Sequence, residues 1–360
     1  MLPGVLTTLL KSKAQIGANR PTALITVGGS EIANVISVSI DRSKRSASQA
    51  TIVVDNKGGA QAPDTTHILW PGKEVTIRLG YGSTQVLLFT GYVDTVTAQN
   101  PPAQITCACR DRSKLALDAM VQMDNADGVR VYGKTYLAQT LEYIFRDLAV
   151  MAGYPAGDIT ANATGITVDE ITFQRESYAD AFQKLCELCR FEWYCDEAGK
   201  LIFQTSVETA GAAAYTFSEG EDLIDISYQI SDAEIYTRIF VVGKDKDGLP
   251  ISATALLDES QYSLPEQKTL YIDAGDLIST TENCAALAAQ EAASVAAKAR
   301  NVTARTVGNP WLQIGDSISI VETTTTISEV YRVTEISHVM DAGASPIFST
   351  TIQCYHYAAS

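Results

Sequence analysis

Hydrophobic and polar residues alternate along most of the first hundred positions. The alternation occupies short segments, namely residues 24–27, 35–40, 50–54, 75–79, 86–96 and 105–109. Turn residues separate these segments, among them Gly28-Gly29, Pro71-Gly72 and Asn100-Pro101-Pro102. Many short alternating segments between such turns are typical of a small β-barrel or sandwich.

Helical spacing replaces the alternation after residue 111. One predicted amphipathic helix stops before Gly153 and Pro155, and its apolar face is Leu137, Leu141, Ile144, Phe145 and Leu148. A second predicted helix follows Ser177, which stands at an N-cap position with Asp180 three residues later, as in a capping box. The apolar face of this second helix is Tyr178, Phe182, Leu185 and Cys189.

A two-stranded ribbon follows the second helix. Residues 191–194 alternate, residues 196–199 form a turn, and residues 201–203 return as a strand. The stretch 172–204 is therefore a helix packed on a ribbon, which predicts a compact α+β module inserted into a mostly β chain.

The β pattern returns in the last third and includes a weak internal repeat. Strands are predicted at 223–230 and 236–242, an Ala-rich helix at 285–299, and strands from Gly308-Asn309-Pro310 to the end. Segment 71–77 resembles 313–320, each is followed by a long strand, and each set ends in a strand that contains Thr and Cys. The matching order predicts two related small β-barrels, and hence an α+β, mainly β fold.

We expect three domains. Residues 1–113 are an N-terminal arm and the first β-barrel, 114–204 are the inserted α+β module, and 205–360 are a linking α+β segment and the second β-barrel. Residues 1–13 have no basic region before their short apolar run, so we read them as an extension or docking arm and not as a signal peptide.

The composition narrows the classes of function. The chain has 360 residues, is 46% hydrophobic and carries a net charge of −15, from 27 Lys and Arg against 42 Asp and Glu. This balance argues against a general nucleic-acid or anionic-membrane binder. We read the polar stretch 41–49 as a solvated loop, whose three basic residues are too few for a nucleic-acid patch. No apolar run approaches the ~20 residues of a transmembrane helix.

Several features of the chain together resemble a known family. The residues that carry the likeness are LFTGYVDTV (88–96), ITCACRDRSKLAL (105–117), the stretch 172–204, GNPWLQIGDSISI (308–320) and YRVTEISHVMDAG (331–343). This order resembles the phage tail baseplate hub family, which includes late control D proteins and the hub portions of type VI secretion spike proteins. None of these segments is a catalytic signature.

The resemblance implies a structural role. It implies a homotrimer whose tail-tube-like barrels form a pseudo-sixfold ring, which joins the sixfold tail tube to the threefold central spike. The implied partners are the tail tube protein or a tube initiator, the central spike protein, the tape-measure protein and the baseplate wedge proteins. Stable nucleic-acid binding and membrane insertion by this chain are not expected. The implied location is the baseplate of a virion tail or tail-like particle, assembled in the bacterial cytoplasm. Because the sequence ends at Ser360 without a spike or lysozyme-like extension, we expect the spike to be a separate polypeptide.

The candidate chemical sites all have plainer interpretations. Cys186 and Cys189 form a CxxC near Cys195, but a zinc site needs a fourth ligand and the nearest downstream histidine is His338. Cys107 and Cys109 alternate on one strand face, and all seven cysteines are expected to be reduced and mostly buried. No Ser and Asp pattern accompanies the three histidines, His67, His338 and His356. We therefore expect no catalytic, cofactor-binding or metal-binding residues.

Two charged stretches complete the candidates. Residues 245–248, Asp-Lys-Asp-Gly, lack the remaining ligands of a calcium loop and predict a solvated turn. Arg110, Asp111 and Arg112 could form an ion-pair cluster between subunits.

A tail-tip cell-wall hydrolase or peptidase is the alternative function. The sequence does not favour a hydrolase or peptidase, because GxSxG, HExxH, P-loop and paired-carboxylate cleft motifs are absent. Clearing of a peptidoglycan suspension would distinguish the two functions.

The acidic charge suggests how a hub channel would work. A ring lined with Asp and Glu would repel DNA, which carries one negative charge per ~1.7 Å of duplex. The plainer explanation is that acidity keeps the protein soluble.

Overall fold

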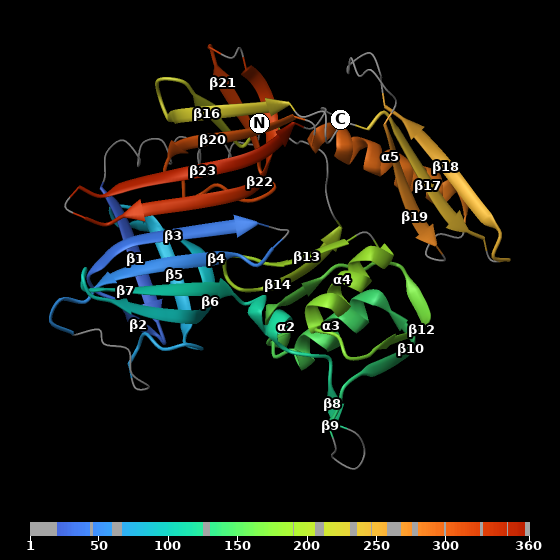
Figure 1. Ribbon diagram of the computed structural model, residues 1–360, viewed down its shortest axis with the longest axis horizontal. Helices are drawn as coiled ribbons and strands as arrows, with labels where there is room; N and C mark the ends of the chain where they lie inside the picture. The colour runs from blue at the N-terminus through green and yellow to red at the C-terminus, as the bar shows by residue number, and fades with distance from the viewer. Residues whose placement is uncertain are drawn as a thin grey trace.

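The fold is mainly β, and the α-helices of the described residues lie in two parts of the chain, 114–189 and 281–298 (Figure 1). The computed structural model describes residues 20–43, 46–59, 67–124, 130–189, 191–205, 212–230, 236–245, 247–257, 268–275, 280–298, 300–324, 327–343 and 345–356. The predicted N-terminal arm, residues 1–13, lies outside them. No helix of the described part is both long and apolar enough to cross a membrane.

The first barrel-like unit contains seven strands and one 3-10 turn. They are β1 (Pro21–Val27), β2 (Ser30–Glu31), β3 (Val35–Ser43), β4 (Gln49–Asp55), η1 (Lys57–Gly59), β5 (Glu74–Tyr81), β6 (Thr84–Gln99) and β7 (Gln104–Asp111). Their apolar positions alternate with polar ones, and the inward set forms one buried cluster that includes Ile40, Ile52, Phe89 and Cys107. The predicted Gly28-Gly29 hairpin is confirmed, because both glycines have positive φ and the turn joins β1 to β2.

The inserted α+β module follows directly. Its elements are α2 (Lys114–Asp118), β8 (Met123–Asp124), β9 (Arg130–Val131), β10 (Lys134–Thr140), α3 (Leu141–Met151), η2 (Ala156–Asp158), β11 (Ile159–Ala161), β12 (Thr167–Phe173), α4 (Tyr178–Cys189), β13 (Phe191–Cys195) and β14 (Leu201–Thr205). The predicted capping box is confirmed: the Asp180 amide donates to Ser177 Oγ at 3.0 Å, and the Ser177 hydroxyl and amide both donate to the Asp180 carboxylate. Phe145 stacks on Phe203, with ring centroids 4.3 Å apart, in a buried core separate from that of the first unit.

One helix prediction was wrong at its start. Leu137 lies in β10, which pairs antiparallel with β12, and its side chain is 61% exposed. Thr140 is extended, with ψ 150°, so α3 begins only at Leu141. The spacing of Leu137 to Leu141 is helical by coincidence, because strand pairing decides the conformation of residues 134–140.

The last third contains the second barrel-like unit and a smaller α+β segment. The unit has β15 (Tyr215–Ser218), β16 (Leu223–Ile230), β20 (Arg300–Val307), β21 (Ser317–Glu322), β22 (Ile327–Asp341) and β23 (Ile347–His356). The segment has β17 (Arg238–Lys244), β18 (Pro250–Leu256), β19 (Thr269–Gly275) and α5 (Thr281–Lys298), with its own buried cluster. The domain boundaries at residues 113 and 204 stay a prediction.

One thirteen-stranded sheet runs through both barrel-like units. Its order is β16-β20-β23-β22-β3-β4-β7-β6-β5-β1-β2, with β21 paired to β22 and β15 paired to β21. Figure 1 shows this ladder descending from β16 through β22 and β3 to β7. The pair β22–β3 is the seam where the second unit meets the first.

The predicted internal repeat is confirmed at the level of single hydrogen bonds. Gly72 N–H donates to the Val93 carbonyl, and Val93 N–H donates back to Lys73. In the second unit, Gly315 N–H donates to the Val333 carbonyl, and Val333 N–H donates back to Asp316. Gly72 and Gly315 have φ of 85° and 92°, which favours glycine in both turns.

The repeat extends further than the sequence predicted. An irregularity in the ladder lies between Val93 and Thr95 in β6 and between Val333 and Glu335 in β22. A second one lies between Val35 and Ser37 in β3 and between Leu223 and Asp225 in β16. The sequences β3-β4-β7-β6 and β16-β20-β23-β22 are therefore matching four-stranded sheets. The first strands differ, because β1 pairs antiparallel with β5 whereas β15 pairs parallel with β21.

Candidate assembly surface

The seam joins the two barrel-like units through a regular antiparallel ladder. Glu335 lies opposite Ser43, Ser337 opposite Asp41 and Asp341 opposite Ser37. The amide of Ala342 extends the ladder by donating to the Ile36 carbonyl at 2.8 Å. The backbone thus makes one surface from two units.

Apolar packing lies beneath the seam and joins the two units. Phe348 belongs to the core of the first unit although it lies on β23, and its ring centroid is 5.7 Å from that of Tyr81. The Tyr81 hydroxyl donates to the Gly308 carbonyl at 2.8 Å. Trp311 packs against the cores of both units. The two units therefore share a buried interface as well as a ladder.

A buried histidine lies at the centre of this interface. His338 is 0% exposed, and its Nδ1 lies 3.0 Å from Thr350 Oγ1. Its Nε2 has no partner in the described part of the chain. Burial, and secondarily the nearby charge of Arg42, lower the pKa of His338 to about 3, so the ring is neutral near pH 7. The histidine is a packing residue here.

Arg42 connects three parts of the molecule. It lies on β3 of the first unit and is 8% exposed. Its guanidinium lies 3.1 Å from the Glu197 carboxylate, in the turn between β13 and β14 of the inserted module. Both terminal nitrogens are also 3.4 Å from Gln313 Oε1, in the turn before β21. One side chain therefore contacts the first unit, the inserted module and the second unit.

This position corrects the interpretation of residues 41–49 as a solvated loop. β3 continues to Ser43, and Arg42 points inward as Val38 and Ile40 do. The buried guanidinium of Arg42 is tolerated because the Glu197 carboxylate and the Gln313 side-chain amide oxygen accept its hydrogen bonds. Lys44 and Arg45, counted with Arg42 in the sequence, lie outside the described residues.

The charged run at the end of β7, residues 110–112, makes its polar contacts within the chain. Arg110 pairs with Asp94 and Asp118, and Arg112 pairs with Glu74 at 2.7 Å and Asp158 at 2.8 Å. Asp111 is buried and accepts from the amides of Ser48 and Ser113, and burial raises its pKa. These partners all lie in the same chain, and a contribution of the cluster to ion pairs between subunits stays a prediction. Arg112 ties the inserted module to the first unit.

We expect Arg42→Met to lower the free energy of unfolding by about 2 kcal/mol. The change keeps the apolar stem but removes the charge, which leaves Glu197 and Gln313 without this partner. We discount the effect because Glu197 is 24% exposed. Urea unfolding followed by tryptophan fluorescence measures it, since Trp311 lies at the interface.

Lys57→Met is the matched control. Lys57 pairs with Asp55 at 3.8 Å but is 87% exposed, so its loss should change stability by less than about 0.5 kcal/mol. Equal effects of the two substitutions would show that Arg42 does not hold the parts together.

Hydroxyl and amide side chains dominate the outward face of the sheet around the seam. They include Ser37, Ser39, Ser43, Gln49, Thr51, Thr95, Thr97, Gln99, Thr106, Ser227, Gln229, Thr303, Ser337, Thr351 and Gln353, which alternate with the inward core positions. Charged outward positions include Asp41, Asp225, Glu335 and Asp341 against Arg110 and Arg305.

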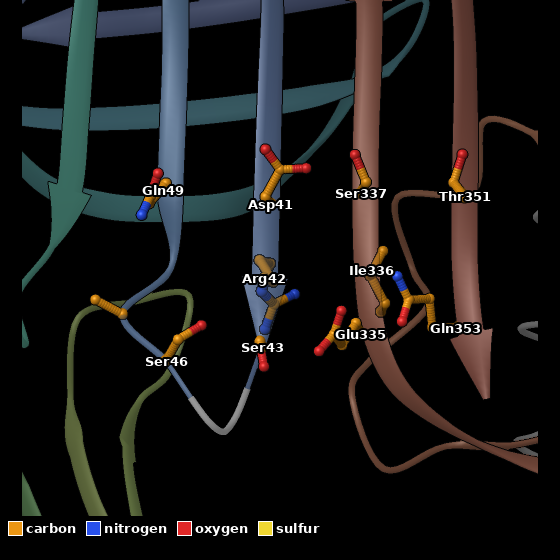
Figure 2. Close-up of a pocket in the computed structure, with 11 residues that line it drawn as sticks. Asp41, Arg42, Ser43, Ser46, Gln49, Glu335, Ile336, Ser337, Thr351 and Gln353 are labelled. Atoms are coloured by element: carbon orange, nitrogen blue, oxygen red, sulfur yellow. The ribbon is translucent and has the colours of Figure 1, made fainter. Parts of the chain in front are cut away.

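The seam part of this face is slightly hollowed. A pocket of about 290 Å³ lies there, lined by residues of β3, β4, β22 and β23. Figure 2 shows Asp41, Ser337 and Thr351 side by side across three strands, with Glu335 and Gln353 beside them. The lining is mostly polar, and its described residues do not form a convergent set of catalytic groups.

The other candidates from the sequence are structural. All seven cysteines are free, six of them buried, and burial raises the pKa of Cys107 and Cys189 to about 11. Cys189 Sγ donates to the Leu185 carbonyl at 3.1 Å, which is helix packing. No group of three or more His, Cys, Asp or Glu suited to a metal ion occurs among the described residues.

The predicted turn at residues 245–248 is confirmed. The Asp245 carboxylate accepts the amides of Asp247 at 2.9 Å and Leu249 at 2.8 Å, and the turn joins β17 to β18. Lys246 lies outside the described residues. His67 accepts from the Leu69 amide at 3.0 Å, and His356 lies 3.8 Å from Glu329, so the histidines are dispersed.

Comparison with known proteins gives a fold and no sequence family. No protein-family model matches the sequence, and no curated protein matches it. Among solved structures, the 43 kDa tail protein of prophage MuSo2 from Shewanella oneidensis is similar, with TM-score 0.70 and 17% identity over 93% of this chain and 98% of that one. A tail protein from Neisseria meningitidis MC58 has TM-score 0.70 and 11% identity over 94% and 97%.

A third similar structure comes from a secretion machine. It is the E. coli c3393 protein, a type VI secretion system component described as structurally similar to the T4 bacteriophage tail proteins gp27 and gp5. It has TM-score 0.56 and 10% identity, covering 93% of this chain and 77% of that one. The chain therefore has the fold of phage tail proteins, as the resemblance in its sequence implied.

Proposed function

We propose that this protein is the baseplate hub of a phage tail or of a phage-tail-like contractile injection system. The observation that carries the proposal is the duplication: two matching four-stranded sheets lie in one chain and share one continuous ladder across the β3–β22 seam. The phage tail fold supports the setting.

The duplication suits a protein that connects two symmetries. Two matching units in each chain give six positions when three chains close a ring. A sixfold tube can then meet the six similar units, while the inserted modules repeat only three times. The proposed ring is thus a homotrimer, joined to the tail tube protein or a tube initiator on one side and to the central spike protein on the other. Wedge proteins would surround it, in a particle assembled in the bacterial cytoplasm.

We further propose that the outward face around the seam lines the channel. A wall of hydroxyl and amide groups with several carboxylates offers few cations to a passing tape-measure protein or DNA. Asp41, Asp225, Glu335 and Asp341 would supply the negative charge that the sequence led us to expect. The role needs no catalytic residue, cofactor, stable nucleic-acid binding or membrane insertion.

Native mass and electron microscopy of the purified protein, alone and with tail tube protein, test the proposal. We expect a mass three times the 38.7 kDa chain and a ring with six similar units around its channel. A persistent monomer at high concentration in the presence of tube protein would refute the ring. A channel lined by another face, or by basic residues, would refute the assignment of the wall.

The tail-tip hydrolase has no supporting observation in the part of the chain that the structure describes. The polar pocket at the seam lacks a paired general acid and base in a hydrophobic setting, and no metal-binding group is present among these residues. Clearing of a peptidoglycan suspension by the purified protein would reverse this judgement.

A further inference from the structure

In the thirteen-stranded sheet, two edges of the described strands occupy positions equivalent to those of the seam strands and lack a neighbouring strand. β16 ends the sheet order, and no described strand pairs with its outer edge. The second edge belongs to β6, because its ladder with β5 stops at Tyr92 and the strand continues alone on that side to Gln99. No described strand pairs with this edge beyond Tyr92, and the outward side chains of Thr95, Thr97 and Gln99 are exposed.

The corresponding edges in the repeat are already paired with each other. In the second unit, the ladder of β22 with β21 stops at Arg332, and residues 335–341 pair instead with β3. β22 matches β6, because Val333 and Val93 make the same hydrogen bonds to a glycine turn. β3 matches β16, because both carry the same ladder irregularity near their starts. The counterparts of β6 and β16, which are β22 and β3, therefore pair with each other at the seam, whereas β6 and β16 have no such partner among the described strands of the chain.

The matching residues can be followed strand by strand. Val93 lies opposite Cys109, which lies opposite Ala50, which lies opposite Ile40. Val333 likewise lies opposite Cys354, then Val302, then Tyr228. Ser337 and Asp41 of the seam thus correspond to Thr97 and Gln229.

We propose that β16 of one chain pairs antiparallel with the end of β6 in a second copy of this chain. The seam fixes the register, with Thr97 opposite Gln229 and Gln99 opposite Ser227. This inference rests on the proposed ring and specifies how its subunits join. The junction is heterologous, because each chain offers β16 to one neighbour and β6 to the other, and such head-to-tail contacts close into a ring when the rotation allows.

The chemistry of both edges favours pairing. Natural edge strands are usually protected by lysine, proline or inward charges. β16 reads LIDISYQI, and residues 95–99 of β6 read TVTAQ, with no lysine or proline in either. Ile224, the residue at the irregularity of β16, is 52% exposed. Its counterpart Ile36 accepts a hydrogen bond from Ala342 inside the seam, so Ile224 occupies the position where a neighbouring chain would end its ladder.

A double-cysteine variant, Thr97→Cys with Gln229→Cys, tests the register. In the seam, Ala342 N–H donates to the Ile36 carbonyl, so the outward pairs one residue away are non-hydrogen-bonded pairs. Cα atoms in such pairs are ~4.5 Å apart, which a disulfide can span. After oxidation with diamide, we expect a shift from the 38.7 kDa band to a covalent band of three chains on a non-reducing denaturing gel.

Three controls make the result specific. Asp41→Cys with Ser337→Cys, the matching pair inside the chain, should form an intrachain disulfide and stay at the mass of one chain. Thr97→Cys with Asp225→Cys, four residues out of register and thus ~13 Å too far, should not cross-link. The native chain should not cross-link either, because six of its seven cysteines are buried.

The outcomes separate this inference from the proposed function. A native trimer that gives no cross-link with Thr97→Cys/Gln229→Cys, while the internal pair oxidises, overturns the strand pairing but leaves the hub. Cross-linking equal to that of the out-of-register pair overturns the register. Cross-linked open chains without a trimer support the pairing and overturn the ring. A protein that neither associates with tube protein present nor cross-links overturns both.

Discussion

Gly308→Ala is expected to lower the free energy of unfolding by about 3 kcal/mol, at the upper end of what overpacking a core costs. A Cβ at this position would lie 2.2 Å from Cγ of Phe348, within the ring and not at a flexible end. Phe348 cannot easily withdraw, because Tyr81 and His338 lie against it with ring centroids 5.7 Å and 5.8 Å away. The expected loss is one of seam stability, since the Gly308 carbonyl also accepts from Tyr81.

The double variant Gly308→Ala/Phe348→Leu is the control. Leucine is smaller and leaves space for the new methyl group, so the double variant should lose less than the two single changes added together. Urea midpoints of the four proteins give this coupling. Additive losses would show that the clash with Phe348 is not the cause, and a fully stable Gly308→Ala protein would contradict the packing of the seam itself.

The stability of the seam should fall as the pH falls below about 6.5. His338 has its pKa lowered by burial to about 3 in the folded protein, whereas an unfolded chain protonates near 6.5. The neutral ring therefore contributes stability that is fully present above pH 6.5 and is lost toward pH 3. The expected loss grows as the pH falls through this window and reaches roughly 3 kcal/mol at pH 4.5.

His338→Phe isolates this effect. Phenylalanine keeps a ring beside Phe348 but does not titrate, and Thr350 Oγ1 still accepts from the Asn309 amide at 2.9 Å. Buried carboxyl groups such as Asp111, whose pKa burial raises, shift stability in the opposite direction and are present in both proteins. We compare urea midpoints of the two proteins from pH 7.5 to 4.5. If the two urea midpoints change with pH in parallel, the pKa of His338 does not differ between the folded and the unfolded protein.

The sequence predicted local structure well where one strong signal decided it. Alternation located most strands of the first unit, and Ser177 with Asp180 located the start of α4 because capping is a local hydrogen-bond pattern. The helix prediction failed at Leu137, because this residue pairs with Glu170, 33 residues later, and strand pairing outweighed the helical spacing. β20 was missed, because its residues follow an Ala-rich helix without a turn signal.

The seam could be predicted only in part. The repeat of glycine turns indicated two similar units, but nothing local indicates that β3 pairs with β22, because the two strands are far apart in sequence. One available signal was missed: Arg42 continues the inward alternation of Val38 and Ile40, a pattern that would have indicated a core position for this charged residue. His338 and Phe348 meet only through the third dimension, so sequence alone could not connect them.

The seam within the chain would make assembly of the proposed ring easier, because it removes some of the associations between separate molecules. Freely diffusing units lose translational and rotational entropy at every contact, which costs about 4–15 kcal/mol per association. A junction between two parts of one polypeptide avoids this loss, because tethering holds the partners at a high effective concentration. In the proposed ring, half of the six unit-to-unit junctions are made as the chain folds. Of the three junctions between chains, two form by association of molecules and the third closes within the ring. If the proposed ring forms, the presence of two matching units in one chain replaces a six-body assembly by a three-body one, which can be completed at a lower concentration of the protein.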